Sequence, residues 1–122
     1  MTLKILAIDD SRTIREMLRI TLTSAGFDVH VAEDGIDGIE MLEEVSPDVV
    51  ITDINMPRMD GFGVINSIRK NRSDRAIPIL VLTTESANDL KQRARESGAT
   101  GWIVKPFDDA KLIFAIRRIA AA

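Results

Sequence analysis

Four apolar runs of this chain end in side chains that can take part in chemistry. These runs are short and carry almost no polar residue inside them. The polar residues that follow or close them are, in chain order, Asp9 and Asp10, Asp53, Thr83, and Lys105. A charge at the end of a buried segment is costly unless an opposite charge or a hydrogen bond compensates it. The consistent placement of these residues therefore indicates a shared site.

The segment DVVITDINMP, residues 48–57, contains the most informative of these ends. Its apolar part is typical of a fully buried strand. Asp53 follows that part directly. A central strand is not expected to continue through Pro57, because proline has no N–H for the hydrogen-bond ladder. We therefore expect Asp53 to lie at the carboxyl end of a buried strand.

The combination of charges predicts phosphoryl transfer to Asp53. Three carboxylates that lie close together repel, and a cation relieves this repulsion. Oxygen ligands without imidazole or thiolate favour Mg²⁺ over zinc or copper. Lys105 supplies a fixed positive charge and Thr83 a hydroxyl donor, and neutralising charge on the moving group is the main task in phosphoryl transfer. A carboxylate can serve as the nucleophile.

Each of these residues also has a plain structural interpretation when it is taken alone. Asp9, Asp10 or Thr83 could cap a helix, and Lys105 could be a solvated surface lysine. The single histidine, His30, is interpreted as a surface residue, and Trp102 as a half-buried packing residue. Three further apolar side chains are interpreted as core fillers, namely Met17, Met41 and Phe62.

The elements that must position this site alternate along the chain. Strand-like runs are expected at residues 3–8, 27–32, 49–53, 77–82 and 101–104, each followed by a segment with helical spacing of apolar residues. Ser11 and Asp108 are expected to cap helices, and Gly26 and Gly98 to end them. The 27–32 run alternates and is expected near an edge. Five strands and five helices with short connections predict an open, mostly parallel sheet with helices on both faces.

The bulk properties fit one domain, 1–122, with 45% hydrophobic residues and a net charge of −3. This charge gives no basic field, so no direct nucleic-acid partner is expected. No apolar run reaches the roughly 20 residues that cross a bilayer, and the N-terminus lacks the features of a secretory signal. The absence of cysteine excludes disulfides and thiolate sites. We expect a cytoplasmic, monomeric protein without membrane insertion.

The residues at the strand ends resemble those of response-regulator receiver domains, and in particular of the single-domain chemotaxis regulators of the CheY type. The resemblance covers essentially the whole chain. It implies a flavodoxin-like, doubly wound sheet of five parallel strands in the order 2-1-3-4-5 with five helices. The motifs that carry it are Asp9-Asp10, the segment DINMPRMDG at residues 53–61, Thr83, and Lys105-Pro106-Phe107.

The resemblance implies that Asp53 accepts a phosphoryl group from a phosphohistidine of a sensor histidine kinase. It implies that Asp10, Asp53 and the backbone carbonyl of Asn55 bind Mg²⁺, and that Asp9 assists through a water molecule. The protein would then catalyse only its own phosphoryl transfer and autodephosphorylation, and would not be an enzyme otherwise.

The resemblance also implies that Thr83 and Lys105 contact the phosphoryl oxygens and that the Lys105–Pro106 peptide bond is cis. In the family, the residue that corresponds to Thr83 moves toward the phosphoryl group, and an aromatic side chain then turns inward and alters a binding face. The corresponding aromatic residue in this chain is Trp102. CheY-like proteins usually have tyrosine at this position, and tryptophan is bulkier.

Asn55 and Glu85 match the CheY side chains that flank the phosphoryl group and would tune its hydrolysis. The implied output is binding to the flagellar motor switch protein in chemotaxis. The exposed face of the helix 86–97 departs from motor-binding relatives, since it has Lys91 where they have an apolar contact.

This departure leaves two alternatives open, a phosphate-sink regulator and a single-domain receiver outside chemotaxis. A phosphatase with an aspartyl nucleophile is a further alternative. Such phosphatases place a second acidic residue two positions after the nucleophile, where this chain has Asn55.

Overall fold

The computed structural model of the chain describes residues 2–71 and 76–121. The polar stretch expected between the third helix and the fourth strand falls partly at residues 72–75, outside the described residues. Helices and strands alternate as the sequence predicts. They are β1 (Lys4–Ile8), α1 (Arg12–Ser24), β2 (Asp28–Ala32), α2 (Gly35–Val45), β3 (Val49–Thr52), α3 (Gly61–Asn71), β4 (Ile79–Thr83), α4 (Asn88–Ser97), β5 (Gly101–Val104) and α5 (Asp109–Ala121).

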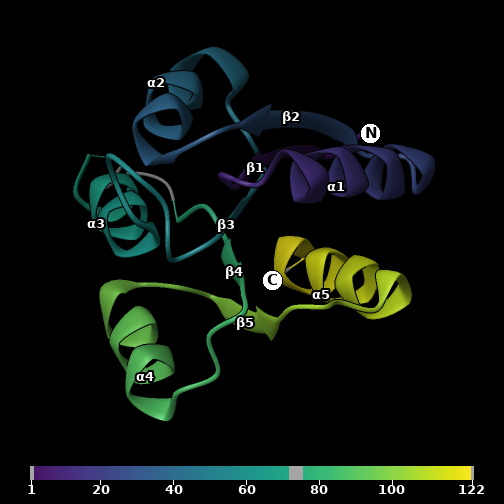
Figure 1. Cartoon of the computed structure of the whole chain (residues 1–122). Coiled ribbons are helices and arrows are strands. Elements are labelled where there is room, and N and C mark those ends of the chain that lie inside the picture. The colour runs from purple at the N-terminus through teal and green to yellow at the C-terminus, as the bar shows by residue number, and fades with distance from the viewer. Residues whose placement is uncertain (1, 72–75, 122) are drawn as a thin grey trace.

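The five strands form one parallel sheet in the order β2-β1-β3-β4-β5. This confirms the predicted doubly wound topology, and β2 is an edge strand as expected. Helices α1 and α5 lie on one face of the sheet, and α2, α3 and α4 lie on the other (Figure 1). Because all strands run in the same direction, their carboxyl ends meet at one edge of the sheet.

Two apolar layers hold the sheet between its helices. One layer packs the buried faces of α2, α3 and α4 against the sheet, and the other packs α1 and α5 against the opposite face. Every residue of β3 and β4 is buried because these central strands are covered on both sides. The sheet therefore presents the ends of its central strands as fixed positions.

The predicted helix ends are confirmed. The side chain of Ser11 accepts a hydrogen bond from the N–H of Ile14, and Asp108 accepts one from the N–H of Ala110. Gly98 ends α4 with a left-handed φ of 116°. The fourth strand starts later than predicted, at Ile79, since proline at position 78 has no N–H for the ladder.

The interpretation of Met17 as a core filler is wrong. Its side chain is 46% exposed, whereas Leu18 and Leu22 of the same helix are fully buried. The buried stripe of α1 is narrower than the apolar pattern suggested, and Met17 lies beside it. Phe62 is buried and Met41 packs against the core, as expected.

Candidate functional site

The carboxyl edge of the sheet brings the predicted acidic residues together. Asp9 directly follows β1 and Asp53 directly follows β3, and these strands are neighbours in register. The N–H of Asp53 donates to the carbonyl of Ile8 at 3.0 Å, and the N–H of Asp9 donates to the carbonyl of Ala32 at 3.1 Å. Backbone hydrogen bonds thus hold both aspartates just beyond the strand ends.

Lys105 directly follows β5, the edge strand opposite β2, and its side chain reaches the two aspartates. Its Nζ lies 2.7 Å from Asp9 Oδ2 and 2.9 Å from Asp53 Oδ2. The three side chains are only 10%, 2% and 11% exposed for Lys105, Asp9 and Asp53 respectively. The lysine is therefore a fixed, nearly buried positive charge between two carboxylates. Burial of a charge is costly unless an opposite charge pairs with it, and the two carboxylates fulfil this condition.

Burial and ion pairing act on the pKa values in this group. Burial raises the pKa of Asp9 above its usual value of 3.8, although hydrogen bonds from Lys105 and from the N–H of Ser11 oppose the rise. Burial alone would lower the pKa of Lys105, but its hydrogen bonds to Asp9 and Asp53 outweigh this and raise it. Lys105 therefore stays charged at neutral pH.

Three carboxylates at this edge could hold a metal ion. Asp9, Asp10 and Asp53 each offer an oxygen, and these oxygens lie within 4.8 Å of one another. Hard oxygen donors from carboxylates suit Mg²⁺. Asp10 is exposed, so solvent can reach the group. The donor set is compatible with the expected magnesium site.

Asp53 is also held by its own backbone. Its Oδ1 accepts a hydrogen bond of 2.6 Å from the N–H of Ile54. Gly61 begins α3 immediately beside this point, where a Cβ would collide with the carbonyl of Asp53. The absence of a side chain at Gly61 lets the helix pack closely against the strand end.

Asn55, Glu85 and Trp102 form a chain of contacts beside Asp53. The amide Nδ2 of Asn55 donates to Glu85 Oε1 at 2.9 Å, and the indole N–H of Trp102 donates to the backbone carbonyl of Glu85 at 3.0 Å. Trp102 is half-buried and packs against the core. The residues expected for phosphoryl hydrolysis and switching thus meet at Glu85.

Thr83 lies at the same edge but faces a different partner. It is fully buried, and its hydroxyl accepts a hydrogen bond of 3.4 Å from the N–H of Glu85. Among the described residues, its hydroxyl has no hydrogen bond with Asp53. The backbone carbonyl of Thr83 accepts the N–H of Lys105 at 2.7 Å, and the Lys105–Pro106 peptide bond is cis as expected.

Two arginines near the site were missed by reasoning from the sequence. Arg15 Nη1 donates to the backbone carbonyl of Asp9 at 2.8 Å. Arg58 lies 3.2 Å from Asp34 and 3.4 Å from Asp37, which are at the start of α2. Neither pairing has a signal in the local sequence, since each depends on how loops and helices are placed in the folded chain.

The described helices include none that is long and apolar enough to span a membrane. His30 lies on the edge strand β2, as expected, with its Nε2 at 3.3 Å from Asp28.

Comparison with protein families gives a match over residues 5–117 to the response regulator receiver domain. Curated relatives include the response regulator MprA of Mycobacterium leprae, which is 37% identical over 96% of this chain, and that of Mycobacterium ulcerans, which is 35% identical over 98%. The chain spans about half the length of these relatives, 50% in both cases.

Solved structures with the same fold cover nearly the whole chain. The chemotaxis protein CheY4 of Vibrio cholerae is 40% identical, with a TM-score of 0.92 over 98% of this chain and 99% of that one. A putative response regulator from Chloroflexus aurantiacus is 30% identical, with a TM-score of 0.93 over the full length of both chains. The receiver domain of a histidine kinase from Syntrophus aciditrophicus is also 30% identical, with a TM-score of 0.89 over 98% of this chain and 91% of that one.

Proposed function

The chain belongs to the response regulator receiver domain family, and we propose that residues 1–122 form one receiver whose Asp53 accepts a phosphoryl group from a histidine kinase. In this reaction an oxygen of Asp53 forms a bond to phosphorus while the phosphorus–nitrogen bond of the donor phosphohistidine breaks. The product is an aspartyl phosphate.

The observation that carries this proposal is the position of Lys105. Its Nζ is within 2.9 Å of Asp53 and is almost buried. A fixed charge in a site with little water interacts strongly with the negative oxygens of a transferring phosphoryl group. Lys105 would exchange its contact with Asp53 for one with a phosphoryl oxygen, while Asp9 keeps its charge compensated.

Asp10, Asp53 and the carbonyl of Asn55 would hold Mg²⁺, and Asp9 would assist through water. When bound, the ion supplies positive charge that offsets the negative charge of the phosphoryl oxygens. The clustering of carboxylate oxygens within 4.8 Å supports this assignment.

Thr83 and Trp102 would transmit the modification. Thr83 and Trp102 both contact Glu85 through hydrogen bonds. Turning the Thr83 hydroxyl toward a phosphoryl oxygen would break its contact with the Glu85 backbone, and Trp102 would then take a different position. The face formed by α4, β5 and α5 would change as a result.

Asn55 and Glu85 would set the lifetime of the phosphorylated state. Their side chains are hydrogen-bonded to each other close to Asp53. An amide and a carboxylate at this place can orient a water molecule for hydrolysis of the aspartyl phosphate. Beyond its own phosphorylation and dephosphorylation, the protein would catalyse no turnover.

The output we propose is control of chemotaxis through binding to the flagellar motor switch protein, by a cytoplasmic monomer. The similarity to the chemotaxis protein CheY4 over both whole chains supports this. A receiver outside chemotaxis is the second candidate, because the curated relatives named above are response regulators called MprA. A phosphate sink is compatible with the same site.

Fluorescence of Trp102, the single tryptophan, tests the phosphorylation site. Beryllofluoride with Mg²⁺ imitates an aspartyl phosphate and should change the emission of Trp102, and the Asp53→Asn variant should lose this response. Absence of a response in the unaltered protein would rule the proposal out. A pull-down with a motor switch peptide, with and without beryllofluoride, then separates the chemotaxis output from the other two.

A further inference from the structure

The outer edge of β2 presents unpaired backbone groups. β2 is the terminal strand of the sheet. The N–H of Asp28 donates to Leu3, and the carbonyl of Ala32 accepts from Asp9, so these two residues turn toward β1. Alternate residues of a parallel strand face the same neighbour. Val29 and Val31 therefore turn their N–H and C=O groups outward, where a further strand could pair with them.

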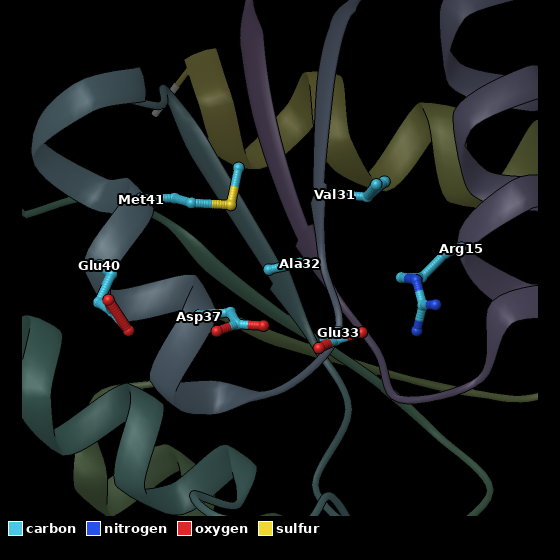
Figure 2. Close-up of a pocket in the computed structure, with 7 residues that line it drawn as sticks. All are labelled: Arg15, Val31, Ala32, Glu33, Asp37, Glu40 and Met41. Carbon is cyan, nitrogen blue, oxygen red and sulfur yellow. The ribbon is translucent and has the colours of Figure 1, made fainter.

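Two adjacent cavities lie beside β2, and together they are called the β2 furrow. Its first part is a cavity of about 400 Å³ at the carboxyl end of β2, with Arg15 of α1 on one side and Asp37, Glu40 and Met41 of α2 on the other (Figure 2). Val31 and Ala32 of β2 lie between these two sides in the same view.

A second cavity of about 290 Å³ continues the furrow toward the other end of β2. It is lined by His30 of β2 and by Met41, Glu44 and Val45 of α2. Met41 lines both cavities, so the two lie next to each other beside this helix. The two linings include Asp28, His30, Val31 and Ala32 of β2. At about 3.3 Å per residue, this strand is long enough to pair with a short extended peptide.

One stripe of α2 forms a wall of the furrow and gives it a negative charge. The stripe has the helical spacing i, i+3, i+4, i+7 and i+8, and its members are Asp37, Glu40, Met41, Glu44 and Val45. Glu33 and Asp28 add two further carboxylates, whereas Lys4 and Arg15 are the cations in the lining. The guanidinium of Arg15 already donates to the backbone of Asp9.

Glu40 and Glu44 leave the negative charge of this wall uncompensated. Within the described part of the chain, neither carboxylate takes part in a hydrogen bond or an ion pair. Both residues are exposed and lie one helical turn apart on the side of α2 that faces the furrow. A cationic partner would therefore meet two free carboxylates in line with the open strand edge.

We propose that the β2 furrow binds an extended, basic segment of a partner protein by strand addition. The backbone of that segment would pair with the N–H and C=O groups of Val29 and Val31, which provides affinity without regard to sequence. Its lysine or arginine side chains on the α2 side would face Glu40 and Glu44, which selects for positive charge. Met41 would contact an apolar side chain between them. This surface is separate from the face of α4, β5 and α5, and the inference does not depend on phosphorylation of Asp53.

Titration with a short peptide of alternating lysine and valine tests the proposal on the unphosphorylated protein. Amide NMR should show shifts at Val29 and Val31 and slower hydrogen exchange of these two amides. The Glu40→Lys/Glu44→Lys variant should bind about tenfold more weakly, since two favourable charge contacts are reversed. Glu43→Lys is the matched control, because Glu43 is an exposed glutamate of α2 outside the furrow lining and its replacement should leave binding unchanged.

Two further peptides separate strand addition from simple charge attraction. An N-methylated form of the lysine–valine peptide lacks the N–H groups that would donate to the carbonyls of Val29 and Val31, and its methyl groups obstruct strand pairing, so it should bind more weakly than the parent peptide. A glutamate–valine peptide should not bind. Equal binding of either peptide, or an equal loss for Glu43→Lys, would overturn the proposal. Protection of Val29 and Val31 that rises with protein concentration in the absence of peptide would also overturn it, because the occupant would then be a second copy of the chain.

Discussion

Two groups of three carboxylates in this molecule have similar composition but are built differently. In each group the carboxylate oxygens lie within 4.8 Å of one another. The strand-end cluster consists of Asp9, Asp10 and Asp53, and the α2 cluster consists of Glu33, Asp34 and Asp37. Each has one basic side chain supplied from a distant part of the chain, Lys105 in the first and Arg58 in the second.

The origin of the carboxylates distinguishes the two clusters. Those of the α2 cluster come from one short segment, and Asp34 accepts the N–H of Asp37 at 3.0 Å as the N-terminal cap of α2. Their proximity is explained by local helix capping. Those of the strand-end cluster follow two different strands, β1 and β3. No helix cap accounts for their proximity.

The cations differ in the same way. The Lys105 side chain is 10% exposed, whereas that of Arg58 is 52% exposed. A nearly buried cation interacts strongly with its partners, and an exposed one is screened by water. The α2 cluster therefore has a local structural explanation, the stabilisation of a helix end, whereas the strand-end cluster, assembled across strands around a nearly buried cation, has none.

The largest expected effect is that of removing the buried cation. Lys105→Met should lower the free energy of unfolding in EDTA by about 3 kcal/mol, since it leaves Asp9 and Asp53 without their charge partner. Urea denaturation at neutral pH measures this. If Arg58→Gln costs as much as Lys105→Met, the proposed difference between the clusters is wrong.

Magnesium should stabilise the protein through the strand-end cluster alone. At a concentration tenfold above its dissociation constant, Mg²⁺ should add about 1.4 kcal/mol to the free energy of unfolding. Asp10→Asn should reduce this gain strongly, because a ligand is lost. Asp37→Asn is the control in the α2 cluster and should keep the full gain. Thermal unfolding with and without Mg²⁺ decides between these outcomes.

Replacement of Arg58 should have a smaller effect on the free energy of unfolding. The size of this effect should depend on how well the new residue adopts the backbone conformation at this position. Arg58 has a left-handed φ of 67°, which glycine adopts without strain. Arg58→Ala should destabilise the protein by about 1 kcal/mol through loss of its exposed ion pairs. Arg58→Gly loses the same pairs but relieves about 1 kcal/mol of backbone strain, so it should be nearly neutral. Equal losses for both variants in urea denaturation would contradict the role given to the backbone.

The smallest expected effect is a dependence on pH in the absence of metal. Burial raises the pKa of Asp9 in the folded protein, and the hydrogen bond from Lys105 partly offsets the rise. A carboxyl group with a raised folded pKa contributes stability at low pH, and this contribution is lost as the pH rises from 3.8 through the folded pKa. Unfolding in EDTA should therefore show Asp9→Asn gaining stability relative to the unaltered protein over this range. A constant difference between the two proteins across the range would show that burial does not govern Asp9.

Much of the fold and of the strand-end cluster could be predicted from the sequence. Residue types and spacing were enough to predict the apolar runs, the helix caps at Ser11 and Asp108, and the end of a helix at Gly98. The strand ends followed from those runs, and parallel strands place their carboxyl ends together. Met17 was misassigned because a side chain at the border of a helical stripe faces the core or the solvent according to how the helix is rotated on the sheet.

The contacts among side chains could not be predicted in the same way. Arg15 could have been taken for a surface arginine, and Arg58 lies in a loop whose neighbour in space is the start of α2. The open furrow beside β2 likewise depends on the spacing between α1 and α2 (Figure 2). Such contacts depend on how loops and helices pack in the folded chain, and no local pattern encodes them.

The sequence by itself determined which residues stand at the ends of the strands, since hydrophobic periodicity and helix caps are local properties of the chain. Only the tertiary structure decided which of those residues form ion pairs with one another. Lys105 follows β5, which is separated from β3 by β4, and its side chain is long enough to cover the distance to Asp53 and Asp9. That distance is a consequence of strand order and packing, and it exists only once the sheet has formed.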